Sequence, residues 1–194
     1  MALILNTAPA TEPVTRAEAA LFMRYTGSLQ NDVIDSLIAA ARKKVEIWTG
    51  RTLVTTTWDF YPDEMYYQSG TLCDVIEIPT GDIIAVSSIT YQDTDDATQT
   101  LSSSLYGVDN KSVINSIFRK NNQNYPSILQ EPNAVKITFT AGYGAAAAVP
   151  EEAKTAIKMM VAGMYENRES FSIDDFKDNP AVKDLMNTFT KYRS

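Results

Sequence analysis

The clearest pattern in the chain is an apolar stripe between residues 31 and 50. Its apolar residues recur at steps of three and four positions, which places them on one face of an α-helix. They are Ile34, Leu37, Ile38, Ala41, Val45 and Trp48. Gly50 follows the last of them, in the position where a glycine with positive φ commonly ends a helix. The pattern therefore predicts an amphipathic helix over 31–50 that stops at Gly50.

Three more helices are expected from their start signals. Thr15 and Glu18 have the spacing of a capping box, which predicts a short helix that ends before Gly27. Pro150 at a first helical position, with two glutamates after it, predicts a second long helix. Its apolar face would hold Ala153, Ile157, Met160, Val161, Met164 and Tyr165. Pro180, after a polar linker, opens a short terminal helix.

Between these helices the chain has β character. Valine, threonine and aromatic residues are frequent there, and polar turn residues separate the runs. The predicted strands are 52–61, 75–78, 83–91, 98–101, 106–109, 113–118 and 135–140. Residues 1–14 are expected to form an extended arm, because Pro9 and Pro13 disfavour helix. We therefore predict an α+β fold in one connector domain, 1–194. A helical core (15–50 and 150–194) would carry a β-rich central insertion (52–140).

The formal net charge of −7 is concentrated in the middle of the sequence. Residues 52–149 hold eleven acidic and four basic side chains, and no Lys or Arg lies between Arg51 and Lys111. Nucleic-acid binding draws its affinity from Lys and Arg at phosphates, so this region should not grip DNA. It is either a solubilising surface, a surface past which DNA moves, or one that meets a basic partner.

The chain offers little equipment for catalysis. It contains no histidine, which removes the commonest general base and zinc ligand. Gly142 and Gly144 lack the lysine of a phosphate loop and are interpreted as a strand exit and hinge. The acidic run 93–96 lacks the distal glutamate of a calcium loop and is interpreted as a hairpin turn. We predict no catalytic residues, no metal site and no cofactor.

The cysteine, the tryptophans and the length of the apolar runs each add an expectation. The single cysteine, Cys73, excludes an internal disulfide and is expected to be a small apolar residue, buried or half-buried. Trp48 and Trp58 are expected in cores or subunit interfaces rather than stacked on nucleobases, because no cations are interleaved with the central aromatics. No apolar run approaches the roughly 20 residues that span a bilayer, so no membrane is expected as a partner.

Several short motifs, in this order and spacing, resemble the head–tail connector (adaptor) proteins of tailed bacteriophages. They are Thr49-Gly50-Arg51, Trp58, Tyr106-Gly107-Val108-Asp109, Thr140-Ala141-Gly142-Tyr143-Gly144, Val149-Pro150 and Tyr165-Glu166-Asn167-Arg168. The resemblance implies a non-enzymatic virion protein, made in the host bacterial cytoplasm and located in the neck. It also implies a dodecameric ring on the portal protein that extends the DNA channel and docks the head-closure or tail-completion protein.

The same resemblance suggests which residues serve these roles. The tail from Pro180 is expected to be mobile in the free protein, with Phe189, Tyr192 and Arg193 contacting the portal. Gly50, Gly142, Gly144 and Pro150 are predicted structural hinges. Genomic DNA would pass through the ring without tight binding. Two alternatives remain open: a host-surface or glycan-binding virion protein, and a histidine-free enzyme that uses paired carboxylates.

Overall fold

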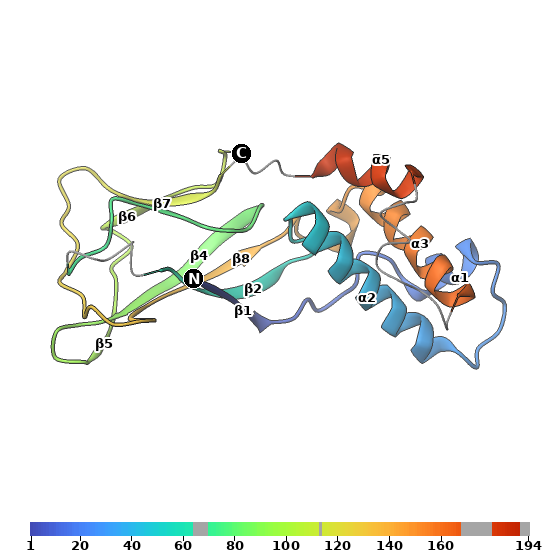
Figure 1. Ribbon diagram of the computed structural model, residues 1–194, viewed down its shortest axis with the longest axis horizontal. Helices are drawn as coiled ribbons and strands as arrows, with labels where there is room; N and C mark the ends of the chain where they lie inside the picture. The colour runs from blue at the N-terminus through green and yellow to red at the C-terminus, as the bar shows by residue number, and fades with distance from the viewer. Residues whose placement is uncertain (64–69, 113, 168–179, 191–194) are drawn as a thin grey trace. The chain divides into compact units, whose positions relative to one another are not determined.

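The computed structural model describes residues 1–63, 70–112, 114–167 and 180–190 of the chain (Figure 1). Its packing divides the chain into two compact units. The β unit consists of Met1–Pro9 and Thr55–Gly142. The helical unit consists of Ala10–Val54 and Tyr143–Tyr192. The first segment of the chain therefore belongs to the β unit, although the first two helices, α1 (Arg16–Phe22) and α2 (Asn31–Thr49), follow it in sequence.

The β unit contains a five-stranded antiparallel sheet in the order β1-β2-β8-β4-β5. These strands are β1 (Ala2–Thr7), β2 (Thr56–Tyr61), β4 (Ile83–Gln92), β5 (Thr98–Thr100) and β8 (Val135–Ala141). A second antiparallel sheet has the order β3-β7-β6. Its strands are β3 (Val75–Glu77), β6 (Tyr106–Asp109) and β7 (Ser116–Arg119). The two edges of the larger sheet are therefore β1 and β5.

One hydrophobic cluster holds the two sheets of the β unit together. The strand β8 alternates fully buried and half-buried positions along its whole length, the pattern of a central strand with one face in a core. Phe139 of β8 and Phe60 of β2 are fully buried in this cluster, as are Ile76 and Ile117 of the smaller sheet. The side chains of both sheets thus share one core.

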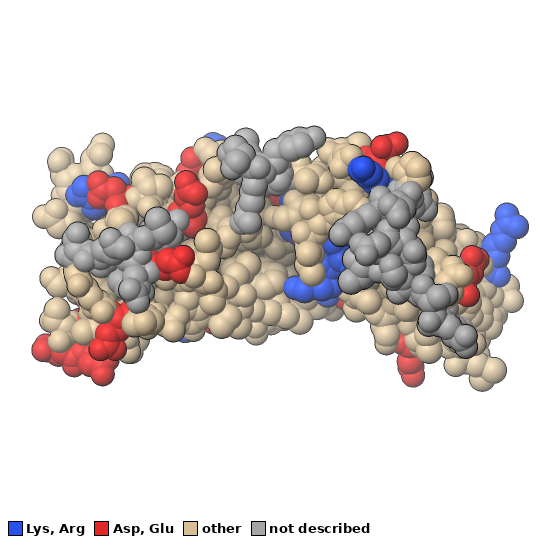
Figure 2. Space-filling model, in the orientation of Figure 1, with Lys and Arg blue, Asp and Glu red and all other residues tan. Residues whose placement is uncertain are grey.

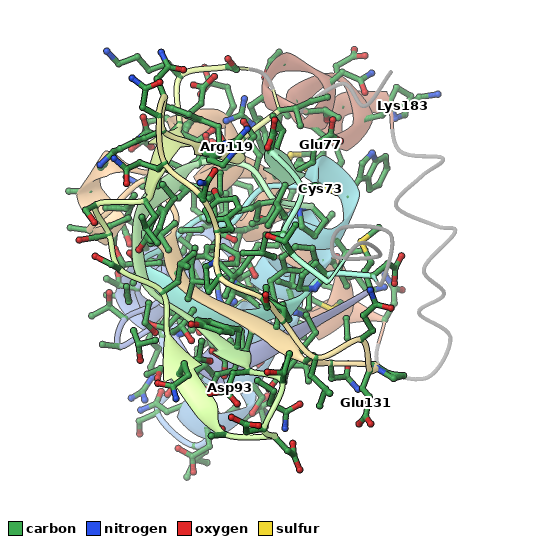
Figure 3. The ribbon with its side chains drawn as sticks, turned by 90° about the vertical axis from the view of Figure 1, so that its left-hand side faces the viewer. Cys73, Glu77, Asp93, Arg119, Glu131 and Lys183 are labelled. Atoms are coloured by element: carbon green, nitrogen blue, oxygen red, sulfur yellow. The ribbon has the colours of Figure 1, made fainter. Side chains whose placement is uncertain are left out.

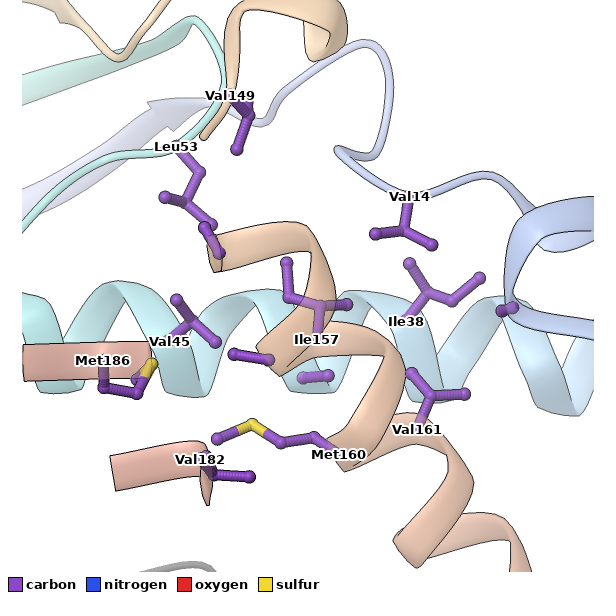
Figure 4. Packing of buried hydrophobic residues seen from close by; sticks show 14 of the residues in the cluster. Val14, Ile38, Val45, Leu53, Val149, Ile157, Met160, Val161, Val182 and Met186 are labelled. Carbon is purple, nitrogen blue, oxygen red and sulfur yellow. The ribbon is translucent and has the colours of Figure 1, made fainter. Parts of the chain in front are cut away.

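The helical unit packs its helices around a separate hydrophobic cluster (Figure 4). The helices are α1 (Arg16–Phe22), α2 (Asn31–Thr49), α3 (Glu151–Glu166) and α5 (Pro180–Phe189), with a 3-10 turn at Ala146–Ala148. The predicted stripes of α2 and α3 face this cluster: Ile38 and Val45 meet Ile157 and Met160 there. The predicted capping box at Thr15 is present at the start of α1.

The prediction of a helical core that carries a β-rich insertion is wrong. The described residues form four α-helices and eight strands in two antiparallel sheets, and the β unit has a hydrophobic cluster of its own. The β part is also not one contiguous insertion, because β1 precedes the first helix and pairs with β2. The sequence pattern missed β1 because its residues do not alternate between apolar and polar. The prediction of a single connector domain over 1–194 stays a prediction.

Candidate assembly surfaces

The described part of the chain offers no metal centre. None of its described side chains forms a group of three or more His, Cys, Asp or Glu that could hold an ion. The acidic run 93–96 forms the turn between β4 and β5, as predicted. Asp93 accepts the backbone N–H groups of Asp95 and Ala97 at 3.0 Å and the Gln99 amide at 2.9 Å. These hydrogen bonds lower the pKa of Asp93, so its carboxylate is committed to shaping the turn.

The predicted hinge residues lie at the ends of elements. Gly50 ends α2 with φ of 66°, the left-handed conformation predicted for it, and its N–H donates to the carbonyl of Glu46 at 3.0 Å. Gly142 and Gly144 have φ of 127° and 106° on either side of a unit boundary. Pro150 directly precedes the first residue of α3. Their role as hinges stays a prediction.

A partly buried ion network ties α2 to the segment before α1. The Arg42 guanidinium donates to Glu12 at 2.7 Å and to Glu46 at 2.8 Å. Glu46 is largely buried and also accepts the N–H of Leu53 at 3.1 Å. Burial raises the pKa of Glu46, and these hydrogen bonds offset only part of that effect. The network therefore fixes the position of α2 relative to the segment before α1 within the helical unit.

One residue of the predicted portal contact, Phe189, lies within the described residues, and its contact with the portal stays a prediction. The helix α5 packs on α3 and α2, and Phe189 is only 8% exposed within the helical cluster. Val182 and Met186, on the same face of α5, are fully buried. In the chain as described, Phe189 therefore anchors α5 to its own unit. Tyr192 and Arg193 lie outside the described residues.

The most apolar exposed feature of the β unit is β1. All six of its residues are exposed, and the strand forms one edge of the larger sheet. Ile4 and Leu5 project to opposite faces of the strand and are 52% and 47% exposed. A half-buried strand would hide one of these faces in its own core. Neither face of β1 is therefore buried in a core within the described residues.

Polar side chains help to fasten β1 to its neighbours in the sheet. Asp59 of β2 accepts the Asn6 amide at 2.9 Å and the Thr138 hydroxyl at 2.6 Å. Partial burial opposes ionisation of Asp59, but these two hydrogen bonds outweigh it and lower its pKa. The side chains of β1, β2 and β8 are thus linked in a row across the sheet.

Within the described residues, the two acidic side chains that adjoin β1 are both paired with it: Asp59 with the Asn6 amide and Asp63 with the ammonium group of Met1. Acidic side chains gather at the end of the β4–β5 hairpin (Figure 2), and Asp93 marks this hairpin in Figure 3. On the smaller sheet, Arg119 holds Asp74 by two hydrogen bonds, at 2.7 and 3.0 Å. Burial raises the pKa of Tyr125, close to this pair, to about 12. Residues 1–9 contain no charged side chain.

Other apolar side chains are exposed on the helical unit and the smaller sheet. Leu21, Phe22, Leu29 and Val33 are exposed between the end of α1 and the start of α2. Val75 and Phe118, partners across β3 and β7, are also exposed. Single exposed apolar residues are normal, but groups of them mark binding surfaces.

Cys73 and the two tryptophans test three further predictions. Cys73 is exposed, so its prediction as a buried or half-buried residue is wrong. It precedes β3 in a turn-rich segment that no periodic pattern identifies. Trp48 and Trp58 pack against the helical and β clusters, as expected of core residues.

No helix within the described residues is long and apolar enough to cross a membrane.

Among the comparisons with known proteins, only the one with solved structures found matches. No family model and no curated protein matches the chain. A chain from the neck of an empty gene transfer agent (GTA) particle, computed with C6 symmetry, matches with a TM-score of 0.80 and 19% identity, over 100% of this chain and 97% of that one. A chain from the virion of a native GTA particle matches with a TM-score of 0.76 and 19% identity, at the same coverage.

A chain from the neck of a native GTA particle, computed with C12 symmetry, matches with a TM-score of 0.68 and 19% identity, over 98% of this chain and 97% of that one. The resemblance to neck connectors stated from the sequence is confirmed at the level of the fold. Since the match spans both units, it concerns the fold of the whole chain rather than one common element.

Proposed function

We propose that this chain is a structural, non-enzymatic protein of the neck of a phage-like virion. The observation that carries the proposal is the fold shared with a GTA neck chain over 100% of this chain and 97% of that one. An abundant local motif would match only part of the chain, and a fold alone supports many functions. Here the fold, the motif order and the absence of a metal-binding group among the described residues favour the same role.

In this role the chain forms a ring by repeating one contact around an axis. The neck structures that share its fold were computed with C6 and C12 symmetry. A closed ring uses heterologous contacts, in which one face of each copy meets a different face of the next. The exposed apolar groups on both units supply more than one such face. We propose a dodecameric ring that adapts the portal to the head-closure or tail-completion protein.

The ring would extend the channel through which DNA leaves the head. The β unit carries eleven acidic and four basic side chains in the stretch 52–149, so a DNA duplex gains few phosphate contacts there. Weak binding suits a conduit, because a tightly held duplex would not slide. In a mobility-shift titration at physiological salt, the isolated protein should retain no duplex at micromolar concentration.

The direct test is electron microscopy of the full chain mixed with its cognate portal. The expected result is a ring of this protein on one end of each portal particle. Portal particles that stay undecorated at saturating concentration would contradict the adaptor role. The same experiment separates the neck protein from a host-surface or glycan-binding virion protein, which would leave the portal bare and bind cell envelopes.

The portal contact itself is proposed to include the tail after α5. Tyr192 and Arg193 lie outside the described residues. A Tyr192→Ala/Arg193→Ala variant that keeps the melting temperature of the wild type and decorates fewer portals would therefore report on contact. Phe189→Ala is unsuitable for this purpose, because Phe189 is buried in that cluster and its loss would also destabilise the unit. Full decoration by a Tyr192→Ala/Arg193→Ala variant would place the portal contact elsewhere.

A further inference from the structure

We propose that β1 is a contact surface between copies of this chain, where a second copy lies along its open edge. The inference rests on the proposed ring and names the surface that builds it. The strand β1 lies at the end of the sheet order and is paired with β2 only. Within the described residues no strand pairs with its other side, so main-chain N–H and C=O groups of that side can pair with another chain.

The side chains of β1 favour coverage by protein. Leu3, Ile4 and Leu5 are consecutive and exposed, so they place apolar surface on both faces of the strand. A partner that lies along the edge covers main-chain groups and apolar side chains together. Strand addition of this kind derives affinity from main-chain hydrogen bonds and specificity from alternating side chains.

The opposite edge strand of the same sheet, β5, has features that discourage pairing with another chain. The strand β5 has three residues, all polar and exposed, next to the acidic turn at 93–96. Short length and nearby charge are the usual protections of an edge strand. In β1, Ala2–Thr7 contains neither proline nor charged side chains, and its one irregularity is a register shift between Leu5 and Thr7. This edge is open to a partner.

Charge identifies the partner as a second copy. Each copy carries a formal charge of −7, so two copies meet at least cost where neither presents carboxylates. Residues 1–9 meet that condition, whereas the β4–β5 turn and the Arg119–Asp74 pair of the smaller sheet do not. A basic partner or a nucleic acid would bind the acidic surfaces instead. Repetition around an axis also ensures that each copy has another copy beside it.

The test compares two lysine pairs on the two edges of one sheet. Ile4→Lys/Leu5→Lys alters β1, and Thr98→Lys/Thr100→Lys is the matched control on β5. Lysine reduces the net negative charge of each copy, so any loss of assembly cannot come from stronger repulsion between copies. All four positions are exposed, so both full-length variants should keep the circular-dichroism spectrum and melting temperature of the wild type.

Rings are then counted by electron microscopy on the cognate portal and by sedimentation velocity without it. We expect rings from the wild type and the β5 variant, and loss of rings from the β1 variant. Rings from the β1 variant at wild-type yield would overturn the inference and leave the proposed function intact. Loss of rings from both variants would overturn the assignment to β1, and a wild type that never forms rings would overturn both proposals.

Hydrogen exchange gives a second measurement on the unmodified protein, which covers the case of a misfolded β1 variant. Amides of Ala2–Thr7 that face away from β2 should exchange rapidly in the free chain and become protected in the ring. Unchanged exchange across this segment on ring formation would also overturn the inference.

Discussion

The first strand and the last described helix of this chain use similar apolar residues in opposite ways. In β1, Leu3, Ile4 and Leu5 are all exposed, whereas in α5, Val182 and Met186 are fully buried. The helix lies against α3 and α2, which offer an apolar face, and the strand has a neighbour on one side only. Apolar residues in a segment such as β1 or α5 thus predict that another surface covers them. They do not predict whether that surface belongs to the same chain or to a partner.

The structure adds to what the sequence suggests about the two segments. The tail was expected to be the mobile partner-binding segment, and the extended arm at 1–14 carried no role. The structure packs α5 into the helical cluster and leaves the side chains of β1 uncovered. The segment best placed to contact another copy is therefore the one at the start of the sequence.

The largest expected effect comes from cutting back a buried side chain of α5. Met186→Ala should lower the free energy of unfolding by about 2–5 kcal/mol, because it leaves a cavity among packed residues. Ile4→Ala in β1 should change it by about 0.5 kcal/mol or less, since Ile4 is 52% exposed and its truncation leaves no enclosed cavity. Guanidinium denaturation followed by circular dichroism measures both.

Asp184→Ala, on the exposed side of α5, is the control for effects of substitution in that helix. Equal stability of the Met186→Ala and wild-type proteins would show that α5 does not pack on the helical unit in solution, and the comparison would fail. A large loss from Ile4→Ala would mean that β1 is already covered in the free chain.

A smaller effect should come from Gly50, an exposed position where burial plays no part. A Cβ built on Gly50 meets no atom within 4 Å, so any cost of substitution comes from the left-handed backbone. Gly50→Val should destabilise the protein by roughly 1 kcal/mol or more, because β-branched residues are strongly disfavoured at positive φ. Gly50→Asn should cost less, since asparagine tolerates that conformation. Urea midpoints that fail to rank glycine, asparagine and valine in that order would argue against this origin.

The smallest expected effect is a change in pH dependence at the row of polar groups that holds β1. The pKa of Asp59 is lowered in the folded chain, so it contributes stability above its unfolded pKa of about 3.9. This contribution disappears as the pH falls through the folded pKa. Thermal melts of wild type and Asp59→Asn between about pH 6 and pH 3 should therefore converge at the acidic end. Melting temperatures that differ by the same amount at every pH would mean that the pKa of Asp59 is the same in the folded and unfolded chain.

Much of the local structure follows from the sequence, because it depends on residues close together in the chain. The capping box at Thr15, the end of α2 at Gly50 and the hairpin turn at Asp93 all appear as predicted. The strand β6 has the bounds expected for it, and the strand β8 differs by one residue. Each of these features is decided by backbone preference or by side chains within a few positions.

Tertiary structure decided what those elements contact. The sequence contains the apolar residues of β1, but only pairing with β2, more than fifty positions away, makes it an edge strand of the β unit. The apolar face of α5 fits an external partner or an internal core equally well, and burial against α3 selects the core. The spacing of apolar residues predicts which side chains become buried. The surface that buries them is decided by long-range packing within the chain and, in the proposed ring, by another copy of the chain.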